Sequence, residues 1–445
     1  MSRSRVVQVA VALVLAALIG AACAVDREPV VDARAAAEPG QTDSPADAET
    51  GSDAGTEPAA ATETTIENYP DAQTRALAAR ARERRPVANS ALPPRHLEPE
   101  RHPESLVDRN RIVSGGPTPD GIPSIDQPTF SPVEAIDWLA DDEPVAVLTI
   151  DGQTRIYPAQ ILIWHEIVND DINGRPVAMT YCPLCNSVVA FDATVTGPDG
   201  GDLILDFGTS GALYQSALVM YDRQTESLWT HFDGVAVIGT LLGANLDILP
   251  AAMVSWVDAR EAHPEAAVLD RPADSSRPYG TVPYPNYETA PPASAFVTVE
   301  PDPRLAAKER VVGINLGDRR IAVDRRALQQ TGLRKIQIGA GEPDLVVLWE
   351  PGTASALDGE NIEDGVAVGS VGVFLATTDE DADEPLRLSV DATGAVVDDR
   401  TGSTWNVRGQ AIAGPLAGRT LLPLAHLDTF WFAWSGYHPD TELIG

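Results

Sequence analysis

The sequence predicts a β-rich α+β fold with two pseudo-repeated lobes of short strands and a few short helices, preceded by a disordered tether. Most apolar runs are short, rich in Val, Ile and Leu, and bounded by Gly, Asp or Pro, a pattern typical of strands. Landmarks of the first half recur in the second at a nearly constant spacing, which indicates an internal duplication. With 445 residues, 44% of them hydrophobic, the chain is neither wholly disordered nor fibrous.

Residues 1–23 predict an exported protein. Two arginines precede an apolar stretch over residues 6–19, and small residues lead to Cys23. Cys23 is placed as in bacterial lipoprotein signals, where the cysteine is lipidated, although Gly20 stands where that pattern prefers leucine. We expect a lipid-anchored, extracytoplasmic protein. The alternatives are ordinary secretory cleavage near Ala24 and an uncleaved single span, and all three place the rest of the chain outside the cytoplasm.

Residues 24–95 predict a disordered, acidic tether rich in Ala and Pro. No apolar periodicity is present over residues 24–71, where 12 acidic residues face only Arg27 and Arg34, so the segment repels itself and extends. Residues 72–88 are rich in Ala and Arg and predict a short basic helix. That helix is either a contact for anionic headgroups or the acidic tether, or a solvated linker.

The first lobe is expected over residues 118–272. Its expected strands are 145–150, 177–181, 188–191, 203–207 and 217–221. Its expected helices are 131–139, 158–169 and 257–263. The second lobe is expected over residues 296–445, with a helix at 429–437 that corresponds to the last helix of the first lobe. A connector over residues 271–292, rich in Pro, Tyr and Ser, predicts a loop that links the lobes or shields an edge.

The duplication is clearest late in each lobe. The stretch DRQTESLW, ending at Trp229, parallels DRTGSTW, ending at Trp405, and pairs Asp222 with Asp399. Beyond these stretches the offset is a constant 175, and it pairs Gly239 with Gly414, Trp256 with Trp431 and His263 with His438. Residues present in both lobes are interpreted as scaffold.

Charge and lysine content exclude some functions. The formal net charge is -33, from 65 acidic against 32 basic residues, so a nucleic acid would be repelled over most of the surface. No nucleic-acid partner is expected, and no particular protein partner is predicted. The chain has two lysines, Lys308 and Lys335, and neither stands in a sequence context that suggests Schiff-base chemistry.

Chemistry concentrates at Cys182 and Cys185, in the stretch YCPLCN at the end of an expected strand. A C-x-x-C pair suits a chelated soft metal or a dithiol, and its short loop makes a purely structural disulfide a weak staple. Since structural zinc takes four ligands, a metal site needs further donors. His165, on the preceding helix, is the nearest candidate, and Glu166 is its expected hydrogen-bonding neighbour. The alternatives for His165 are a surface or core-edge role.

The second lobe offers an internal control for the cysteines. At the matching positions it has Glu350 and Thr353, while the proline between them is retained. If the cysteines only supported the fold, both lobes would need them, so the comparison favours a functional site. His426 and His438 are weaker candidates for completing a metal site between the lobes.

Several long motifs resemble a prokaryotic family of unknown function, DUF3179. They are DGIP at 120–123, WHEIVND at 164–170, TYCPLC at 180–185 and MYDRQTESLW at 220–229. The resemblance is strongest over residues 118–270 and extends to residues 402–438. It implies no activity, but it implies that the WHE and CPLC segments are recurrent family features that share one site. This chain has Asn186 where the family often has Gly.

The function favoured by these observations is binding of a soft metal, copper or zinc. Cys182 and Cys185 would be thiolate ligands, His165 a neutral imidazole ligand, and Glu166 a partner that orients it. One alternative is a thiol-disulfide oxidoreductase in which Cys182 attacks and Cys185 resolves. A third hypothesis is a cell-surface binding module without chemistry.

Overall fold

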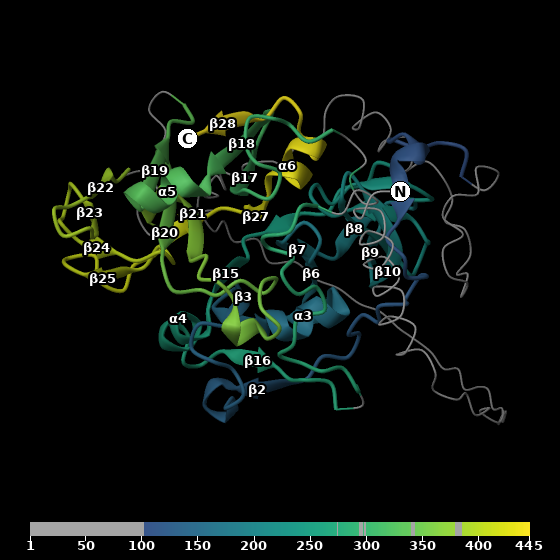
Figure 1. Ribbon diagram of the computed structural model, residues 1–445, viewed down its shortest axis with the longest axis horizontal. Helices are drawn as coiled ribbons and strands as arrows, with labels where there is room; N and C mark the ends of the chain where they lie inside the picture. The colour runs from purple at the N-terminus through teal and green to yellow at the C-terminus, as the bar shows by residue number, and fades with distance from the viewer. Residues whose placement is uncertain (1–101, 274, 293–296, 298–299, 340–342, 379–384) are drawn as a thin grey trace, which may run out of the picture. The chain divides into compact units, whose positions relative to one another are not determined.

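The computed structural model describes residues 102–273, 275–292, 297, 300–339, 343–378 and 385–445. These residues belong to one compact unit. The expected signal peptide, the lipidation site Cys23 and the tether over 24–95 lie outside the described residues. The predicted class is confirmed: within the described part, short strands form several small sheets and helices are few and short (Figure 1). No described helix is both long and apolar enough to cross a bilayer.

The first half builds three main sheets and two short helices. One sheet has the order β15-β3-β4-β16-β2, formed by Ala252–Ser255, Pro144–Ile150, Gln153–Pro158, Ala267–Leu269 and Phe130–Pro132. The second has the order β14-β7-β6-β5, formed by Ile248–Leu249, Ser187–Asp192, Arg175–Cys182 and Ile167–Ile172. The third has the order β1-β10-β11-β12-β13, formed by Ile112–Ser114, Phe207–Tyr214, Ala217–Asp222, Leu228–Thr230 and Ala236–Ile238. The helices are α3 (Ala159–His165) and α4 (Trp256–Ala262), and β8 (Thr194–Thr196) pairs with β9 (Asp202–Ile204).

The second half also builds three sheets. Their orders are β27-β17-β18-β28 (Leu427–Phe430, Arg310–Leu316, Arg319–Asp324, Glu442–Ile444), β19-β20-β21-β26 (Leu333–Ile336, Leu345–Glu350, Ser370–Thr378, Leu421–Pro423) and β22-β23-β24-β25 (Leu388–Val390, Val396–Asp398, Thr404–Trp405, Ala411–Ala413). The helices are α5 (Arg325–Thr331) and α6 (Trp431–Tyr437). Three 3-10 turns, η1 (Arg109–Arg111), η2 (Val133–Ala135) and η3 (Ile362–Asp364), complete the described elements.

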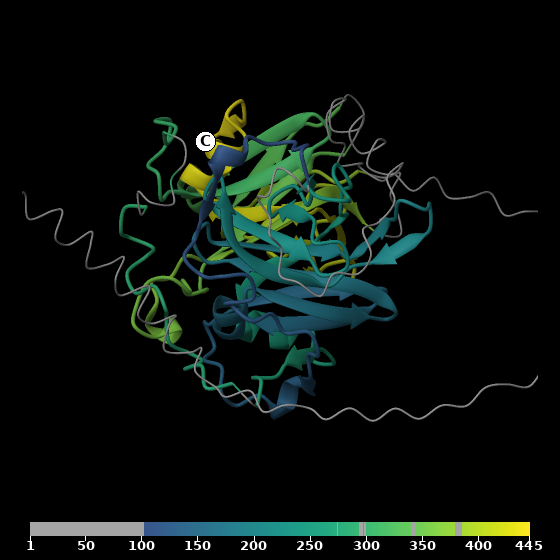
Figure 2. The same ribbon diagram turned by 90° about the vertical axis from the view of Figure 1, so that its right-hand side faces the viewer.

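The two halves pair their strands in the same way. In the first half, β3 is antiparallel to β4 and β15, while β4 is parallel to β16. In the second half, β17 is antiparallel to β18 and β27, while β18 is parallel to β28. The halves also meet reciprocally, since β15 of the first lies against β21 and β27 of the second lies against β7. Figure 2 shows green and yellow strands of the second half beside teal strands of the first.

One turn recurs with nearly the same hydrogen bonds. After β11, the Asp222 carboxylate accepts the Trp229 indole N–H at 2.9 Å and the backbone N–H groups of residues 225 and 227. After β23, the Asp398 carboxylate accepts the Trp405 indole N–H at 3.1 Å and those of residues 401 and 403. The predicted pairing of Asp222 with Asp399 is therefore wrong by one residue. The aspartate that accepts the indole N–H stands at the same distance before the tryptophan in both halves, and in the second half that residue is Asp398.

Some predicted elements differ in extent. The predicted helix at 158–169 ends at His165 because Glu166 adopts a left-handed conformation (φ 60°) and β5 begins at once. The predicted helix at 131–139 is wrong except for the η2 turn, since its first residues pair with β16 as strand β2. The predicted strand at 203–207 is divided between β9 and β10. In each case tertiary pairing overrides local pattern.

The largest apolar core draws on both halves. It contains side chains from α3, β6, β7 and β11 together with side chains from β27 and α6. Tyr279, Tyr284 and Tyr287 of the connector pack against this core. The connector therefore covers the core beside the cysteine strand.

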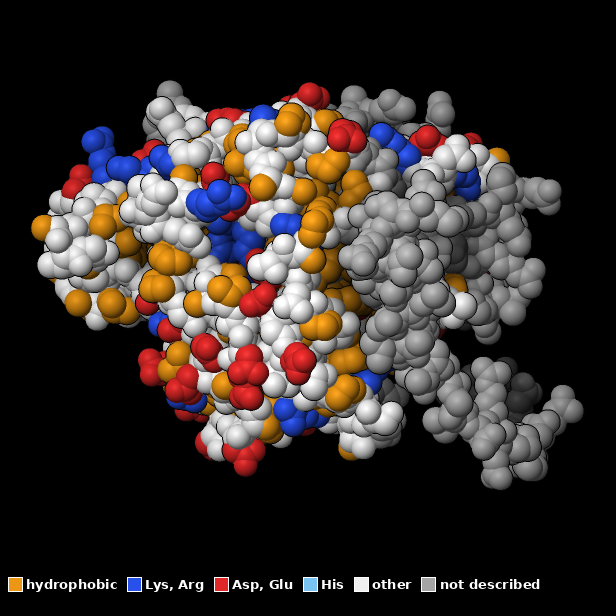
Figure 3. All heavy atoms as spheres, in the orientation of Figure 1, with side chains coloured by type: hydrophobic (Ala, Val, Ile, Leu, Met, Phe, Trp, Pro, Cys, Tyr) orange, Lys and Arg blue, Asp and Glu red, His pale blue; other side chains and the backbone are white. Residues whose placement is uncertain are grey.

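On the face shown in Figure 3, acidic side chains gather over the lower part of the molecule.

Candidate metal centre

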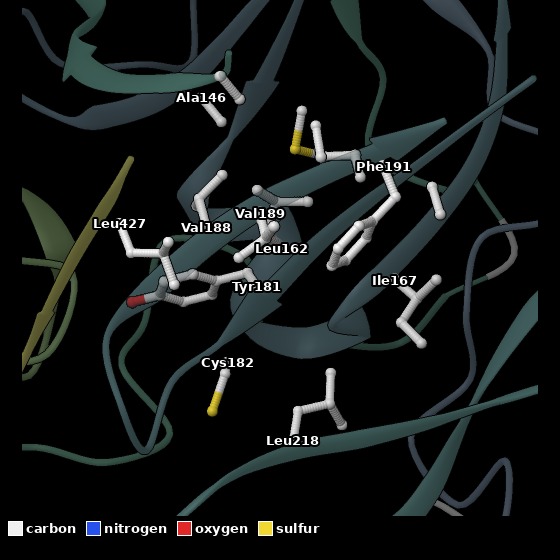
Figure 4. Close-up of a cluster of buried hydrophobic side chains, with 14 of the residues drawn as sticks. Ala146, Leu162, Ile167, Tyr181, Cys182, Val188, Val189, Phe191, Leu218 and Leu427 are labelled. Atoms are coloured by element: carbon white, nitrogen blue, oxygen red, sulfur yellow. The ribbon is translucent and has the colours of Figure 1, made fainter. Parts of the chain in front are cut away.

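The two cysteines lie where the β6–β7 hairpin turns. Cys182 ends β6 and pairs in register with Ser187, the first residue of β7, and Asn186 closes the loop with a left-handed backbone (φ 52°). Both thiols are free, and their side chains are 2% and 0% exposed. Figure 4 shows Cys182 among apolar side chains, with Tyr181 above it and Leu218 of β11 below. The loop thus turns both sulfurs into the core.

A histidine from a different sheet completes the group. His231 directly follows β12 and is fully buried. One donor atom each from Cys182, Cys185 and His231 lie within 4.8 Å of one another, and this is the group of metal-capable side chains found among the described residues. Three soft or borderline donors therefore face one another in a site closed to solvent.

Hydrogen bonds fix the tautomer of His231. The Thr180 hydroxyl donates its proton to the Val189 carbonyl at 2.7 Å, so its oxygen accepts the N–H of His231 Nε2 at 3.0 Å. His231 Nδ1 is then unprotonated. It lies 3.3 Å from Ser187 Oγ, which is 3.1 Å from Cys185 Sγ. The unprotonated Nδ1 therefore lies beside Ser187, which in turn contacts Cys185.

Burial sets the protonation of the group. Burial lowers the pKa of His231 to about 3, so the imidazole is neutral at physiological pH. Burial, with a smaller effect of neighbouring Cys182, raises the pKa of the Cys185 thiol well above its usual value. Its S–H points to the Cys182 carbonyl, with the sulfur 3.7 Å from that oxygen. Without a metal, Cys185 is a protonated thiol and His231 is ready to act as a ligand.

The structure places the histidine predicted from the sequence elsewhere. His165 Nδ1 is 2.8 Å from the Pro123 carbonyl and Nε2 is 2.7 Å from the Tyr279 hydroxyl, so both ring nitrogens have partners outside the thiol group. His165 is not part of the Cys182–Cys185–His231 group. Its contacts instead tie the connector and residue 123 to α3.

The other sequence candidates also lie apart from the group. Glu166 is buried beside the connector, and burial raises its pKa to about 8 against the opposing charge of Arg277. His426 Nδ1 is 3.0 Å from the Leu424 carbonyl, and the His438 ring lies against Trp434 with a centroid separation of 4.4 Å. None of the three is part of the described metal-capable group.

Residues 119–441 match the protein family described as "Protein of unknown function (DUF3179)". The chain belongs to the DUF3179 family. This confirms the resemblance carried by the WHE, CPLC and DRQTESLW motifs. No curated protein and no solved structure matches the chain.

The thiol loop of this DUF3179 chain is held from outside its own hairpin. The Cys185 carbonyl accepts the Phe430 backbone N–H at 3.0 Å and the Thr429 hydroxyl at 2.7 Å, both from β27. The Leu184 carbonyl accepts the Tyr287 hydroxyl of the connector at 2.8 Å. Segments more than 100 residues downstream therefore fix the position of the loop.

One of the two lysines lies against this loop. Lys308 Nζ is 2.9 Å from the centroid of the Tyr287 ring and 4.4 Å from that of Phe430, and it donates to the Tyr287 carbonyl at 2.9 Å. Burial lowers its pKa to about 7, opposed by the charges of Glu288 and Cys185. The sequence around Lys308 gave no sign of this position, because only the fold brings Lys308 beside Tyr287 and Phe430.

A pocket adjoins the other face of the hairpin. It holds roughly 500 Å³ of space, including its open mouth, and is lined in part by Tyr181 and Asn186, which flank the cysteines. Arg310 and Asp428 also line it and pair with each other at 3.3 Å. The pocket therefore borders the residues on either side of the thiol loop, while the thiols themselves are buried.

His231 was missed in the sequence because no spacing rule links it to a C-x-x-C pair 46 residues earlier. A signal was nevertheless available. His231 stands two residues after Trp229, and the residue two after Trp405 is Val407. The comparison of halves that singled out the cysteines would also have singled out this histidine.

Proposed function

We propose that the chain is an exported, lipid-anchored protein that binds one soft metal ion, copper or zinc, through Cys182, Cys185 and His231. The observation that carries this proposal is the meeting of two sulfurs and one imidazole nitrogen within 4.8 Å in the buried core. Donors around a bound zinc or copper ion lie about 3.5–4 Å apart, given metal–ligand distances near 2.0–2.3 Å. Small side-chain adjustments suffice to close the site.

The hydrogen bonds around the imidazole support the same function. Metal-bound histidines generally donate their second N–H to a fixed acceptor, which orients the ring and increases its basicity. Thr180 supplies that acceptor to His231, and the Val189 carbonyl orients Thr180 in turn. Metal binding by two thiolates would release the proton of each thiol to solvent and leave His231 unchanged in charge.

A thiol-disulfide oxidoreductase receives less support. Such an enzyme needs an accessible thiol with a lowered pKa to attack the disulfide of its substrate. Both cysteine side chains are at most 2% exposed, and burial raises the pKa of Cys185. A binding module without chemistry gives no role to three converging donors.

Metal content tests the proposal. The full chain, carrying Cys23→Ser in every sample so that the site thiols are the remaining ones, is purified anaerobically, offered Cu(I) or Zn(II), desalted and analysed by mass spectrometry. We expect about one ion per chain, lost in Cys182→Ser and in His231→Asn. His165→Gln is the matched control and should retain the metal.

Two results would contradict the proposal. A metal-free wild-type chain after loading would remove the metal function and direct attention to the reduction potential of the cysteine pair. Loss of metal in His165→Gln with retention in His231→Asn would restore the ligand set expected from the sequence. Circular dichroism of each variant separates lost binding from lost folding.

A further inference from the structure

Lys308 is placed to act on the charge of the thiol group. The two rings that face its ammonium belong to Tyr287 and Phe430, and these same residues bind the carbonyls of Leu184 and Cys185. The ammonium and the loop thus share their immediate supports. The charge of Lys308 and that of the Cys185 thiol act on each other across this short path.

The surroundings of Lys308 suit a cation. The faces of aromatic rings carry negative electrostatic potential, and two of them lie within 4.4 Å of Nζ. The Tyr287 carbonyl accepts one of its N–H groups. Only the charged form of the side chain gains from the two ring faces, so the cage favours the ammonium and opposes the burial that lowers its pKa.

Two ion pairs beside Lys308 carry no net charge. Arg310 binds Glu288 through two contacts of 2.7 Å, and Arg325 binds Asp428 at 2.5 Å. Two arginines and two carboxylates sum to zero. Two thiolates, a neutral imidazole and one ammonium together carry a charge of -1, which a monovalent ion neutralises and a divalent ion reverses.

We propose that Lys308 makes the Cys182–Cys185–His231 site selective for a monovalent soft cation, Cu(I), over Zn(II). The inference rests on the proposed metal function and names its ion. A net charge buried in the core is costly, so the neutral assembly with Cu(I) is favoured over the positive one with Zn(II). The donor count agrees, because structural zinc takes four ligands and the described group supplies three.

The test compares two ions and two lysines in the full chain with Cys23→Ser. Cu(I) is supplied anaerobically through a chromophoric chelator, and Zn(II) through a zinc chelator, so that competition gives both affinities. In Lys308→Gln we expect Cu(I) binding to weaken by about tenfold or more and Zn(II) binding to strengthen several-fold. Lys335→Gln makes the same change in net charge at an exposed position of β19 and should leave both affinities unchanged.

Lys308→Arg keeps the charge and should keep the preference for Cu(I). An unchanged ratio of Cu(I) to Zn(II) affinity in Lys308→Gln, with the variant folded by circular dichroism, would overturn the role of Lys308 while leaving the metal site standing. Failure of the unmodified chain to bind either ion would overturn the metal function itself and this inference with it. Ag(I), a soft monovalent ion that resists oxidation, should follow the Cu(I) pattern.

Discussion

The ends of β6 and β20 occupy the same place in the two halves and differ in chemistry. Cys182 ends β6 opposite Ser187, and Glu350 ends β20 opposite Ser370. Within each loop a side chain then reaches that serine: Cys185 Sγ lies near Ser187 Oγ, and the Thr353 hydroxyl binds Ser370. In the second half the strands pair without thiols, across a longer loop over residues 351–369, so this pairing does not itself require thiols.

The same comparison separates scaffold from site elsewhere. The turns at Asp222 and Asp398 share their bonds to a tryptophan and to two backbone N–H groups, which indicates a structural role in both halves. His231, by contrast, has Val407 as its counterpart, and its partner Thr180 has Leu348. The first half therefore differs from the second at the atoms that would hold a metal, while the supporting turns agree.

The largest expected effect comes from replacing both thiols with hydroxyls, the group that Thr353 carries in the second half. In Cys182→Ser/Cys185→Thr, metal content should fall from about one ion per chain to none, because no sulfur donor remains. β6 and β7 should still pair, as β20 and β21 do without thiols. Metal analysis together with thermal unfolding of the metal-free protein measures both. A large loss of apo-protein stability would instead assign the cysteines a structural role and break the comparison.

The next effect is a pH dependence that arises at the end of α3 and has no counterpart at the end of α5. Burial raises the pKa of Glu166 to about 8, while its counterpart at the end of α5 is Gly332. Between about pH 4.5 and 8 the unfolded chain ionises this carboxyl and the folded chain keeps it protonated, so the free energy of unfolding falls as pH rises. The loss should be on the order of 3–5 kcal/mol by pH 8.

Urea unfolding of Glu166→Gln at pH 5 and pH 8 measures this term. The variant should lose less stability than the wild type over that interval, since glutamine does not titrate. Equal losses in the two proteins would show that Glu166 ionises normally in the folded state. Because the variant removes one titrating group and keeps its shape, other pH-dependent groups contribute equally to both proteins.

The paired turns should respond alike. Asp222→Ala and Asp398→Ala each leave an indole N–H and backbone N–H groups without their acceptor, at a cost of about 2–4 kcal/mol. Denaturant unfolding of the two variants measures it. Metal bound per folded chain should stay unchanged in both, and loss of metal in Asp398→Ala would contradict the assignment of that turn to scaffold.

The smallest expected effect concerns the helix ends. Gly332 ends α5 with φ 68° and has open space where a side chain would stand, so Gly332→Ala should destabilise by about 1 kcal/mol through backbone strain alone. Glu166 carries the same strain at the end of α3. A thermal shift measurement on Gly332→Ala gives the cost of a side chain in this left-handed conformation. The same cost applies to Glu166 at the end of α3.

Sequence patterns predicted the strand-rich class and the two strands that flank the cysteines, because short Val- and Ile-rich runs bounded by Gly and Pro are local signals. They did not predict the third donor. His165 is near Cys182 in sequence, yet its ring turns to Pro123 and Tyr279, whereas His231 arrives from another sheet through long-range packing. Lys308 was overlooked for the same reason, since its cage is built from residues 287 and 430.

The supports of the thiol loop also set an order of events. The Cys185 carbonyl accepts hydrogen bonds from the Thr429 hydroxyl, which lies 244 positions later in the chain, and from the adjacent Phe430 N–H. Contacts of such long separation form late in folding. A nascent or truncated chain that ends before β27 therefore lacks these two hydrogen bonds to the cysteine loop. The loop reaches its native position only when nearly the whole polypeptide has folded.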